Sequence, residues 1–189
     1  MTIAVAKDEA FNFTYRSCID SLKALGEVIF FSPLRDKNLP ACDLLYLPGG
    51  YPELYASELD ANKSMRLSIK AFGESNGKIF AECGGFMYLC QDIDQHKMCG
   101  IFPFSATMDN ARLHLGYRQT MIHGHCMKGH EFHYSALKEC SLNPHIRQEN
   151  RQLSATGKPV DTAIYYYKNV IAGYTHWYWA ETGILTFWT

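Results

Sequence analysis

Short, largely apolar runs alternate with stretches of helical spacing in the first half of the chain. Four such runs, each followed by a polar residue or proline, predict buried strands; they are 3–6, 28–31, 44–47 and 78–81. Apolar positions recur at helical spacing over 15–25 and over about 53–75, with a break near Asn62. Alternating strands and helices are typical of right-handed βαβ units, so we expect a mainly parallel sheet with helices on both faces.

The pattern changes in the second half of the chain. Gly, His, Tyr and Thr alternate weakly over 111–135, which predicts antiparallel ribbons rather than βαβ units. Residues 141–161 are polar, and we expect a mobile loop there. The runs 162–167 and 170–174 predict a hairpin. Because no repeat or linker interrupts residues 1–189, we expect one domain: a three-layer α/β fold with a mainly parallel sheet and an antiparallel extension.

Charge and cysteine usage exclude several classes of function. The chain has 18 Lys and Arg against 19 Asp and Glu, so a basic surface for nucleic acid or an anionic membrane is not expected. No apolar run is long enough to span a bilayer, and the first residues do not have the pattern of an export signal. The seven cysteines show no repeating spacing. We therefore expect reduced thiols in a cytoplasmic protein, without nucleic-acid or membrane partners.

The most informative segment is Ala-Glu-Cys-Gly-Gly at 81–85, which lies between a predicted strand and an apolar helical stretch. Small residues around a central nucleophile are typical of a tight strand-to-helix elbow, because larger side chains would collide in that turn. The helix N-terminus would favour the thiolate of Cys83, and the Gly84 N–H would point toward an oxyanion. The alternative is an inert buried cysteine beside a glycine-rich turn.

Two further segments fit the same chemistry. Leu-Pro-Gly-Gly-Tyr-Pro-Glu at 47–53 follows a predicted strand, at the sheet edge where α/β folds bind ligands. Gly50 would let a second backbone N–H approach the substrate, although a plain tight turn explains the glycines as well. His176 follows a strand-like run and is the best placed histidine for a general base to Cys83.

Five segments, taken together and in order, resemble the class I glutamine amidotransferase domain of the cobyric acid synthase type, the domain found in cobyrinic acid a,c-diamide synthases. They are 31–36, 47–53, 81–89, 115–118 and 129–135. The resemblance implies a flavodoxin-like three-layer fold in which Cys83 attacks the side-chain amide of glutamine and His176 is the catalytic histidine. It also implies that Gly50 and Gly84 are oxyanion donors, with Tyr51 beside them in the glutamine site.

The same resemblance implies a larger enzyme. Ammonia from glutamine would serve the ATP-dependent amidation of the a and c carboxylates of cobyrinic acid. ATP and magnesium are expected only in an N-terminal synthetase domain, in cis or in trans, because this chain has no G-x-x-x-x-G-K-[ST] loop and itself needs no cofactor. The alternatives are a glutaminase subunit for another tetrapyrrole or a cell-wall precursor, and a catalytically silent domain that binds a partner.

Several residues remain outside this scheme. Many class I amidotransferases place a glutamate two residues after the histidine, but this chain has Tyr178 there, with Glu181 further on. The resemblance to the cobyrinic-type enzymes implies a Cys–His dyad. Asp8, Glu131 and His133 are candidates for a secondary site. Asp8 would orient the base or the glutamine, with a plain surface loop as the alternative. Glu131 and His133 would face the acceptor domain or serve as structural hydrogen-bonding groups. A metal cluster is an alternative that we do not favour; its residues would be His123, His125, Cys126, His130 and His133. The aromatic residues 177–179 are expected in packing or at a partner interface.

Overall fold

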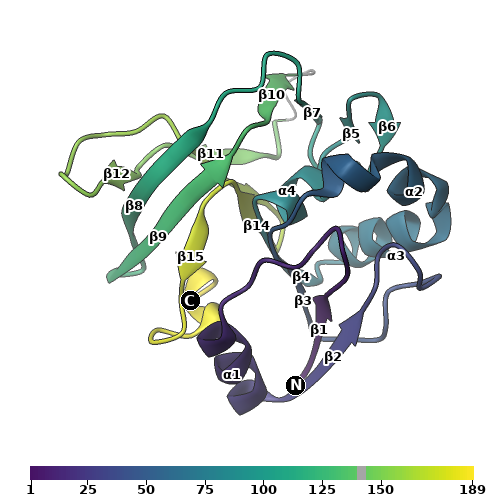
Figure 1. Cartoon of the computed structure of the whole chain (residues 1–189). Helices are drawn as coiled ribbons and strands as arrows, with labels where there is room; N and C mark the ends of the chain where they lie inside the picture. The colour runs from purple at the N-terminus through teal and green to yellow at the C-terminus, as the bar shows by residue number, and fades with distance from the viewer. Residues whose placement is uncertain (140–143) are drawn as a thin grey trace.

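The computed structural model describes residues 1–139 and 144–189, and a seven-stranded sheet forms its centre (Figure 1). The strands run in the order β11-β13-β14-β4-β3-β1-β2, and the pairs from β14 to β2 are parallel. Their bounds are β1 Thr2–Ala6, β2 Glu27–Phe31, β3 Leu44–Leu47, β4 Lys78–Glu82, β11 Arg147–Glu149, β13 Ile164–Tyr167 and β14 Val170–Gly173. The predicted mainly parallel sheet is therefore confirmed, and the predicted hairpin is the antiparallel pair β13–β14.

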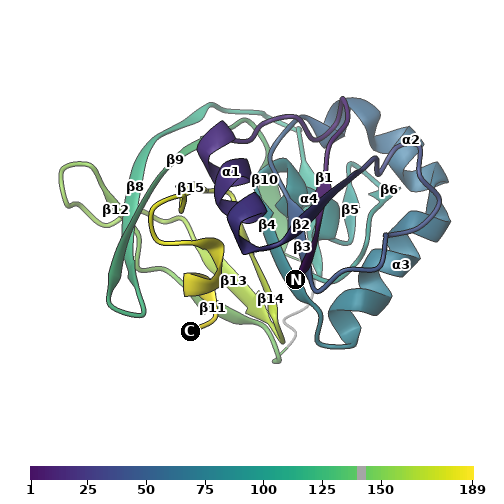
Figure 2. The ribbon, with the colours of Figure 1, turned by 90° about the horizontal axis from the view of Figure 1, so that it is seen from below.

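Helices cover both faces of this sheet, which gives the predicted three layers (Figure 2). Helix α1 (Arg16–Leu25) and the C-terminal 3₁₀ turn η2 (Ile184–Phe187) pack on one face. The other face is covered by the 3₁₀ turn η1 (Pro52–Tyr55) with α2 (Ala56–Ala61), α3 (Lys63–Glu74) and α4 (Gly84–Leu89). The break near Asn62 is confirmed, because its side chain caps α3 by accepting the Met65 N–H. Among the described residues no helix is both long and apolar enough to cross a membrane.

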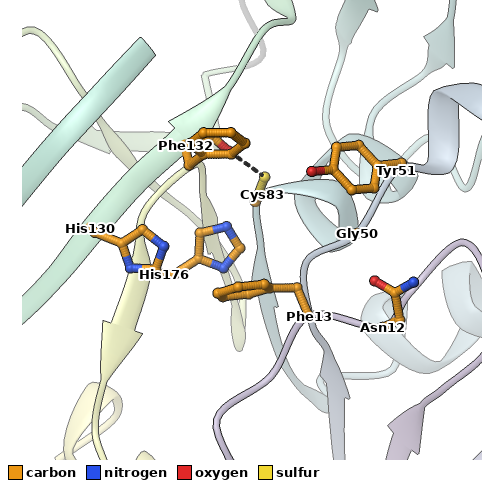
Figure 3. Close-up of a pocket in the computed structure, with 8 residues that line it drawn as sticks. All are labelled: Asn12, Phe13, Gly50, Tyr51, Cys83, His130, Phe132 and His176. Atoms are coloured by element: carbon orange, nitrogen blue, oxygen red, sulfur yellow. Dashed lines mark hydrogen bonds between the residues drawn. The ribbon is translucent and has the colours of Figure 1, made fainter. Parts of the chain in front are cut away.

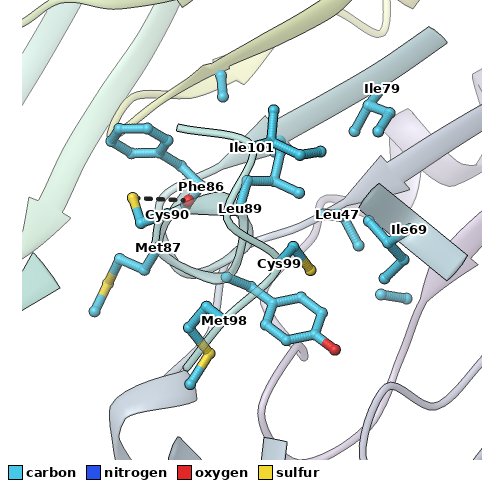
Figure 4. Close-up of a cluster of buried hydrophobic side chains, with 14 of the residues drawn as sticks. Leu47, Ile69, Ile79, Phe86, Met87, Leu89, Cys90, Met98, Cys99 and Ile101 are labelled. Carbon is cyan, nitrogen blue, oxygen red and sulfur yellow. Dashed lines mark hydrogen bonds between the residues drawn. The ribbon is translucent and has the colours of Figure 1, made fainter. Parts of the chain in front are cut away.

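Helix α4 lies inside the larger hydrophobic core. All of its residues, Gly84 to Leu89, are buried. Figure 4 shows Phe86 and Leu89 of this helix among apolar side chains of the neighbouring elements, such as Ile79 and Ile101. Because close-packed interiors resist displacement, the turn that precedes α4 has a rigid base.

Two smaller sheets extend the fold. One has the order β10-β7-β5-β6, with β5 Asp92–Ile93, β6 His96–Lys97, β7 Phe104–Thr107 and β10 Ala136–Glu139. The other has the order β12-β8-β9-β15, with β8 His114–Ile122, β9 His125–His133, β12 Leu153–Ser154 and β15 His176–Tyr178. The antiparallel ribbon expected over 111–135 is confirmed as the β8–β9 hairpin. His123 and Gly124 form its two-residue turn, both with positive φ, as a type I′ turn requires.

The loop predicted over 141–161 is wrong for two short segments of its described part, while the rest is irregular. Strand β11 pairs with β13, and β12 pairs with β8. Both are short edge strands, which pair with one neighbour only and carry no alternation of apolar and polar residues. The hydrophobic pattern of the sequence therefore gave no indication of these two strands. Residues 141–143 of that prediction lie outside the described residues.

Candidate active site

Cys83 occupies a sharp turn between β4 and α4, as the elbow motif predicted. Its φ of 48° and ψ of −107° are unusual for a residue with a side chain, and such conformations cost about 1–3 kcal/mol. The Cys83 N–H donates to the Gly173 carbonyl at 2.8 Å, which ties the turn to β14. A Cβ on Gly85 would collide with the Leu47 carbonyl, so this position requires glycine. Neighbouring elements thus hold the cysteine in a strained conformation.

The two predicted oxyanion glycines lie against each other beside this turn. A Cβ built on Gly84 would come within 2.9 Å of the Gly50 carbonyl oxygen and 3.0 Å of the Gly50 nitrogen. A Cβ on Gly50 would collide with the Ala10 carbonyl. Glycine at both positions is what allows the loop after β3 to approach the start of α4 this closely.

A pocket of about 310 Å³ opens over the turn (Figure 3). Four of the residues that line it, Gly50, Tyr51, Cys83 and His176, belong to the predicted site. The other four, Asn12, Phe13, His130 and Phe132, were not predicted as site residues. His130 and Phe132 lie in the segment 129–135 that carried part of the resemblance, so a signal for them existed. Asn12 and Phe13 carried none.

Cys83 and His176 face this pocket from different sheets. The Cys83 side chain is 5% exposed, and its thiol donates to the Phe132 carbonyl at 3.7 Å. His176 begins β15 and is 4% exposed. In Figure 3 its ring is drawn between His130 and Cys83. Strand β15 has this position because it pairs with β9, with His176 opposite His130.

Packing, rather than a carboxylate, holds the His176 ring. The ring stacks on His130 at 4.9 Å between centroids, and Phe13 meets it edge-on at 4.6 Å. It also lies over Gly49, where a Cβ would collide with it. The His176 Nδ1 is buried and has no hydrogen-bond partner among the described residues. This agrees with a dyad in which Tyr178 replaces the usual glutamate.

Burial keeps both groups neutral in the resting site. It raises the pKa of the Cys83 thiol to about 12, although the Gly84 N–H acts in the opposite direction. Burial also lowers the pKa of His176 to about 3, and the nearby His130 and His133 add to this effect. The expected resting thiolate is therefore wrong. Helix α4 has only six residues, and its end does not offset the loss of water around the sulfur.

Comparisons with known proteins decide the family. The model of the family described as the CobB/CobQ-like glutamine amidotransferase domain matches residues 2–183. The chain belongs to this family. The amidotransferase domain is 41% identical over 187 residues to the cobyrinate a,c-diamide synthase of Fusobacterium nucleatum, covering 92% of this chain and 40% of that protein. It is 39% identical to the hydrogenobyrinate a,c-diamide synthase of Stutzerimonas stutzeri, with coverages of 93% and 41%.

Solved structures confirm the fold of the amidotransferase domain. A glutamine amidotransferase from Thermotoga maritima superimposes with a TM-score of 0.59 at 10% identity, covering 93% of this chain and 75% of that one. Another crystal structure of a glutamine amidotransferase gives 0.59 at 18% identity, with coverages of 92% and 89%. The chain spans about 40% of the length of the curated synthases that it matches.

Asp8 does not orient the base or line the pocket, and that hypothesis is wrong. Its buried carboxylate accepts the N–H groups of Ala10, Phe11 and Leu34 and the hydroxyl of Ser32. These bonds fix the loop after β1 against the loop after β2. Because Asn12 and Phe13 follow directly, Asp8 acts on the pocket only by supporting the loop that forms one wall.

Glu131 and His133 lie on the face of β9 opposite to Phe132, in a second cavity of about 550 Å³. Glu131 accepts hydrogen bonds from Arg118 at 2.7 Å, from His133 at 2.7 Å and from Thr162 at 2.8 Å. Burial alone would raise the pKa of Glu131, but His133, Thr162 and Arg118 together lower it to about 2. Of the two alternatives left open, the geometry supports structural hydrogen bonding.

The alternative metal cluster is not assembled. Among the described residues, only His114, Glu131 and His133 form a group whose ligand atoms approach within 4.8 Å. The His114 and His133 rings stack 4.7 Å apart at an angle of 3°, so their in-plane lone pairs do not converge on one point. Glu131 is moreover already bonded to Arg118. This arrangement does not favour an ion.

The aromatic residues 177–179 separate into two roles. Trp177 and Trp179 are buried in the core on the α1 face of the sheet, while Tyr178 is half-exposed and meets Tyr15 edge-on. Strand alternation explains the division, because successive side chains of β15 point to opposite faces. Packing therefore accounts for the two tryptophans.

Proposed function

We propose that this amidotransferase domain hydrolyses glutamine and supplies the ammonia to an ATP-dependent synthetase part. The observation that carries the proposal is the convergence, in one pocket, of the strained Cys83 elbow, the buried His176 and the Gly50 backbone, with Gly84 packed directly against Gly50. A nucleophile, a base and backbone donors for an oxyanion are the groups that acyl transfer requires.

Because the Cys83 thiol and the His176 imidazole are both neutral at rest, the reaction begins with a proton transfer between them. Glutamine enters the pocket, His176 takes the proton of the Cys83 thiol, and the sulfur attacks the side-chain carbonyl carbon. The backbone N–H groups of Gly50 and Gly84 receive the oxyanion of the tetrahedral intermediate. The imidazolium returns its proton to the departing nitrogen, so ammonia leaves and a thioester remains. His176 then takes a proton from water and the hydroxide attacks the thioester. Glutamate leaves as the carbon–sulfur bond breaks, and the imidazolium returns its proton to the Cys83 sulfur.

We propose that the ammonia serves the amidation of the a and c carboxylates of cobyrinic acid, the reaction named for the relatives. The synthetase part would hold ATP and magnesium, because this chain has no phosphate-binding loop of the G-x-x-x-x-G-K-[ST] type. The six described cysteines are all free thiols, which supports a reducing, cytoplasmic setting. An intact pocket argues against a silent binding domain.

The decisive experiment separates the two halves of the reaction. In the full-length protein, Cys83→Ser is expected to abolish glutamate release and glutamine-dependent amide formation. Amide formation from free ammonia should continue, because the synthetase part is untouched. Cys126→Ser changes an exposed cysteine outside the pocket and is the matched control.

Three outcomes would contradict the proposal. Glutamine hydrolysis that survives Cys83→Ser would remove the assigned nucleophile. Parent protein that consumes no glutamine would support the silent domain. Product formed only with another tetrapyrrole or a cell-wall carboxylate would keep the glutaminase and reject cobyrinic acid as acceptor.

A further inference from the structure

A fully buried carboxylate that the proposed reaction does not use lies directly before the nucleophile. Glu82 is the last residue of β4, is 3% exposed, and is surrounded by the aromatic core of the α1 face. Burial raises its pKa to about 7, against hydrogen bonds that lower it. Burying an ionisable group among apolar side chains is costly, so its retention beside Cys83 requires a reason.

The two oxygens of Glu82 connect strands that carry the two reacting groups. Oε1 accepts the backbone N–H of Trp177 at 2.8 Å, and Oε2 accepts the hydroxyl of Tyr46 at 2.7 Å. Trp177 is the residue after His176 on β15. Strands β4 and β15 belong to different sheets and are not paired. The Glu82 side chain thus links the strand that ends at Cys83 to the backbone of His176.

His176 depends on such a link because few polar contacts orient it. Its Nδ1 has no partner among the described residues, and its ring is held by Gly49, Phe13 and His130. Where packing alone orients a ring, the position of its backbone decides where the nitrogen lies. A displacement of about 1 Å in such a site can reduce the rate about 100-fold.

We propose that Glu82 is a positioning residue that holds the Trp177 amide and thereby keeps the His176 imidazole in register with the Cys83 thiol. It does not touch the substrate or the reacting atoms. Its carboxylate is bonded to Tyr46 and Trp177 of the core on the α1 face, and Glu82 is not among the residues that line the pocket. The inference rests on the proposed glutaminase function and assigns the task of orienting the base to the residue next to the nucleophile.

The test compares three variants of the full-length protein. Glu82→Ala removes the acceptor for the Trp177 N–H. Glu82→Gln keeps an oxygen at that position and loses the charge. Phe187→Leu loosens the same core cluster, where Phe187 packs on Phe80 and lies 6.5 Å from the Trp177 ring, and it keeps the Glu82 carboxylate; it is the matched stability control.

Glutamate release gives the first readout. We expect Glu82→Ala to lower kcat about 100-fold with KM changed less than threefold, because the pocket that binds glutamine is intact. Glu82→Gln should retain kcat within about tenfold, and Phe187→Leu should leave it unchanged despite a lower melting temperature. A folded Glu82→Ala with parental kcat, or a Gln variant as impaired as the Ala variant, would overturn the proposal.

The NMR signals of the Trp177 amide and the His176 ring give a second readout that needs no activity. Both should shift in Glu82→Ala, and the Gln variant should stay near the parent for the ring. Phe187→Leu should leave the His176 ring signal in place, so the ring and not the amide of Trp177, which packs against Phe187, is the readout for this control. If Glu82→Ala does not fold, the test rests on Glu82→Gln. That variant keeps an oxygen for the Trp177 N–H, so a displaced His176 ring in it would overturn the proposal. Parent protein that releases no glutamate would reject the glutaminase function, while these shifts still test the link from Glu82 to His176.

Discussion

At the scale of single residues, burial determines the chemistry of the candidate site. Cys83 and His176 would each be partly ionised near neutral pH in water, but both are nearly inaccessible here and remain uncharged. A neutral thiol beside a neutral imidazole has a low background reactivity. We therefore expect the pair to become reactive when bound glutamine presents a carbonyl carbon to the sulfur.

This neutrality predicts a selective pattern of alkylation. Because burial raises the pKa of the Cys83 thiol to about 12, the thiol is protonated at pH 7. A small neutral reagent such as iodoacetamide should therefore modify the exposed Cys126 before Cys83. An electrophile built on glutamine should modify Cys83 first, because it binds in the pocket. Mass spectrometry after brief labelling measures both, and rapid modification of Cys83 by iodoacetamide would show that the resting thiolate exists.

The buried histidine also predicts acid sensitivity of the fold. The pKa of His176 is lowered to about 3 in the folded chain, so the unfolded chain takes up a proton at a higher pH, near 6.5. The contribution of His176 to stability is therefore lost as the pH falls from about 6.5 toward 3. Urea melts at several pH values should show that His176→Phe reduces this slope, with His125→Phe, an exposed strand position, as control. Equal slopes in the parent and His176→Phe would contradict the assignment.

At the scale of secondary-structure elements, close contacts between backbones and rings set the site. The loop after β3 passes under His176, and Gly49 is the point of contact. Strand β9 carries His130 and Phe132 on one face and the Glu131–His133 pair on the other. One face of β9 thus lines the pocket, and the hydrogen-bonded Glu131–His133 pair on the other face holds the strand in place.

Gly49→Ala tests the contact under the base. The new Cβ would collide with the His176 ring, so the ring must move, and we expect kcat for glutamate release to fall about 100-fold or more. Gly124→Ala is the matched control: its φ of 83° makes alanine strained, but no atom lies within 4 Å of the new Cβ. It should cost about 1 kcal/mol of stability and leave kcat unchanged. Equal kcat values in the two variants would show that Gly49 does not position the ring.

Glu131→Gln tests the support behind β9. The change leaves the buried Arg118 without its ionic partner, and we expect a loss of about 3 kcal/mol in the free energy of unfolding near pH 7. Because the pKa of Glu131 is lowered to about 2, its stabilising effect is present above about 4.5 and is lost as the pH falls toward 2. Parent and variant should therefore converge at low pH in denaturant melts. A difference that persists at pH 2 would contradict an ionic origin.

At the scale of the whole molecule, one face of the β8–β9 hairpin exposes apolar side chains next to the pocket. Leu115, Tyr117 and Met121 share the alternation of β8, and Leu113 directly precedes the strand; all four are exposed, with Leu115 63% and Tyr117 73% exposed. A groove lined by Phe13, Leu115, Tyr117 and His130 joins this face to the pocket that contains Cys83. Such a surface is typical of a contact with another domain, and it fits the proposed synthetase part.

Leu115→Ser combined with Tyr117→Ser tests this surface in the full-length protein. Both side chains are exposed, so the melting temperature of this domain should change little. Glutamine-dependent amide formation should fall about tenfold or more, because ammonia escapes when the two parts separate. Ammonia-dependent formation should persist. Leu67→Ser, an exposed leucine on α3, is the control, and an identical loss in that variant would argue against a specific docking face.

Local sequence determined much of this protein. The apolar runs define four parallel strands, Asn62 divides the helical region, and the small residues around Cys83 define the elbow, because each depends on neighbours within a few residues. Polar edge strands such as β11 and β12 carry no such local signal. The positions of Cys83, Gly50 and His176 were therefore predictable, while their surroundings were not.

Only the tertiary structure decided how those residues meet. The pairing of β15 with β9 brings His130 onto the His176 ring, and the folding of Asp8 into a loop contact removes it from the site. Burial reverses the expected ionisation of Cys83, and Glu82 links two strands that are 95 residues apart in the chain. Each of these effects depends on the exclusion of water or on contacts between distant segments. The sequence of residues specifies the reacting groups, and the folded chain determines their orientation and charge.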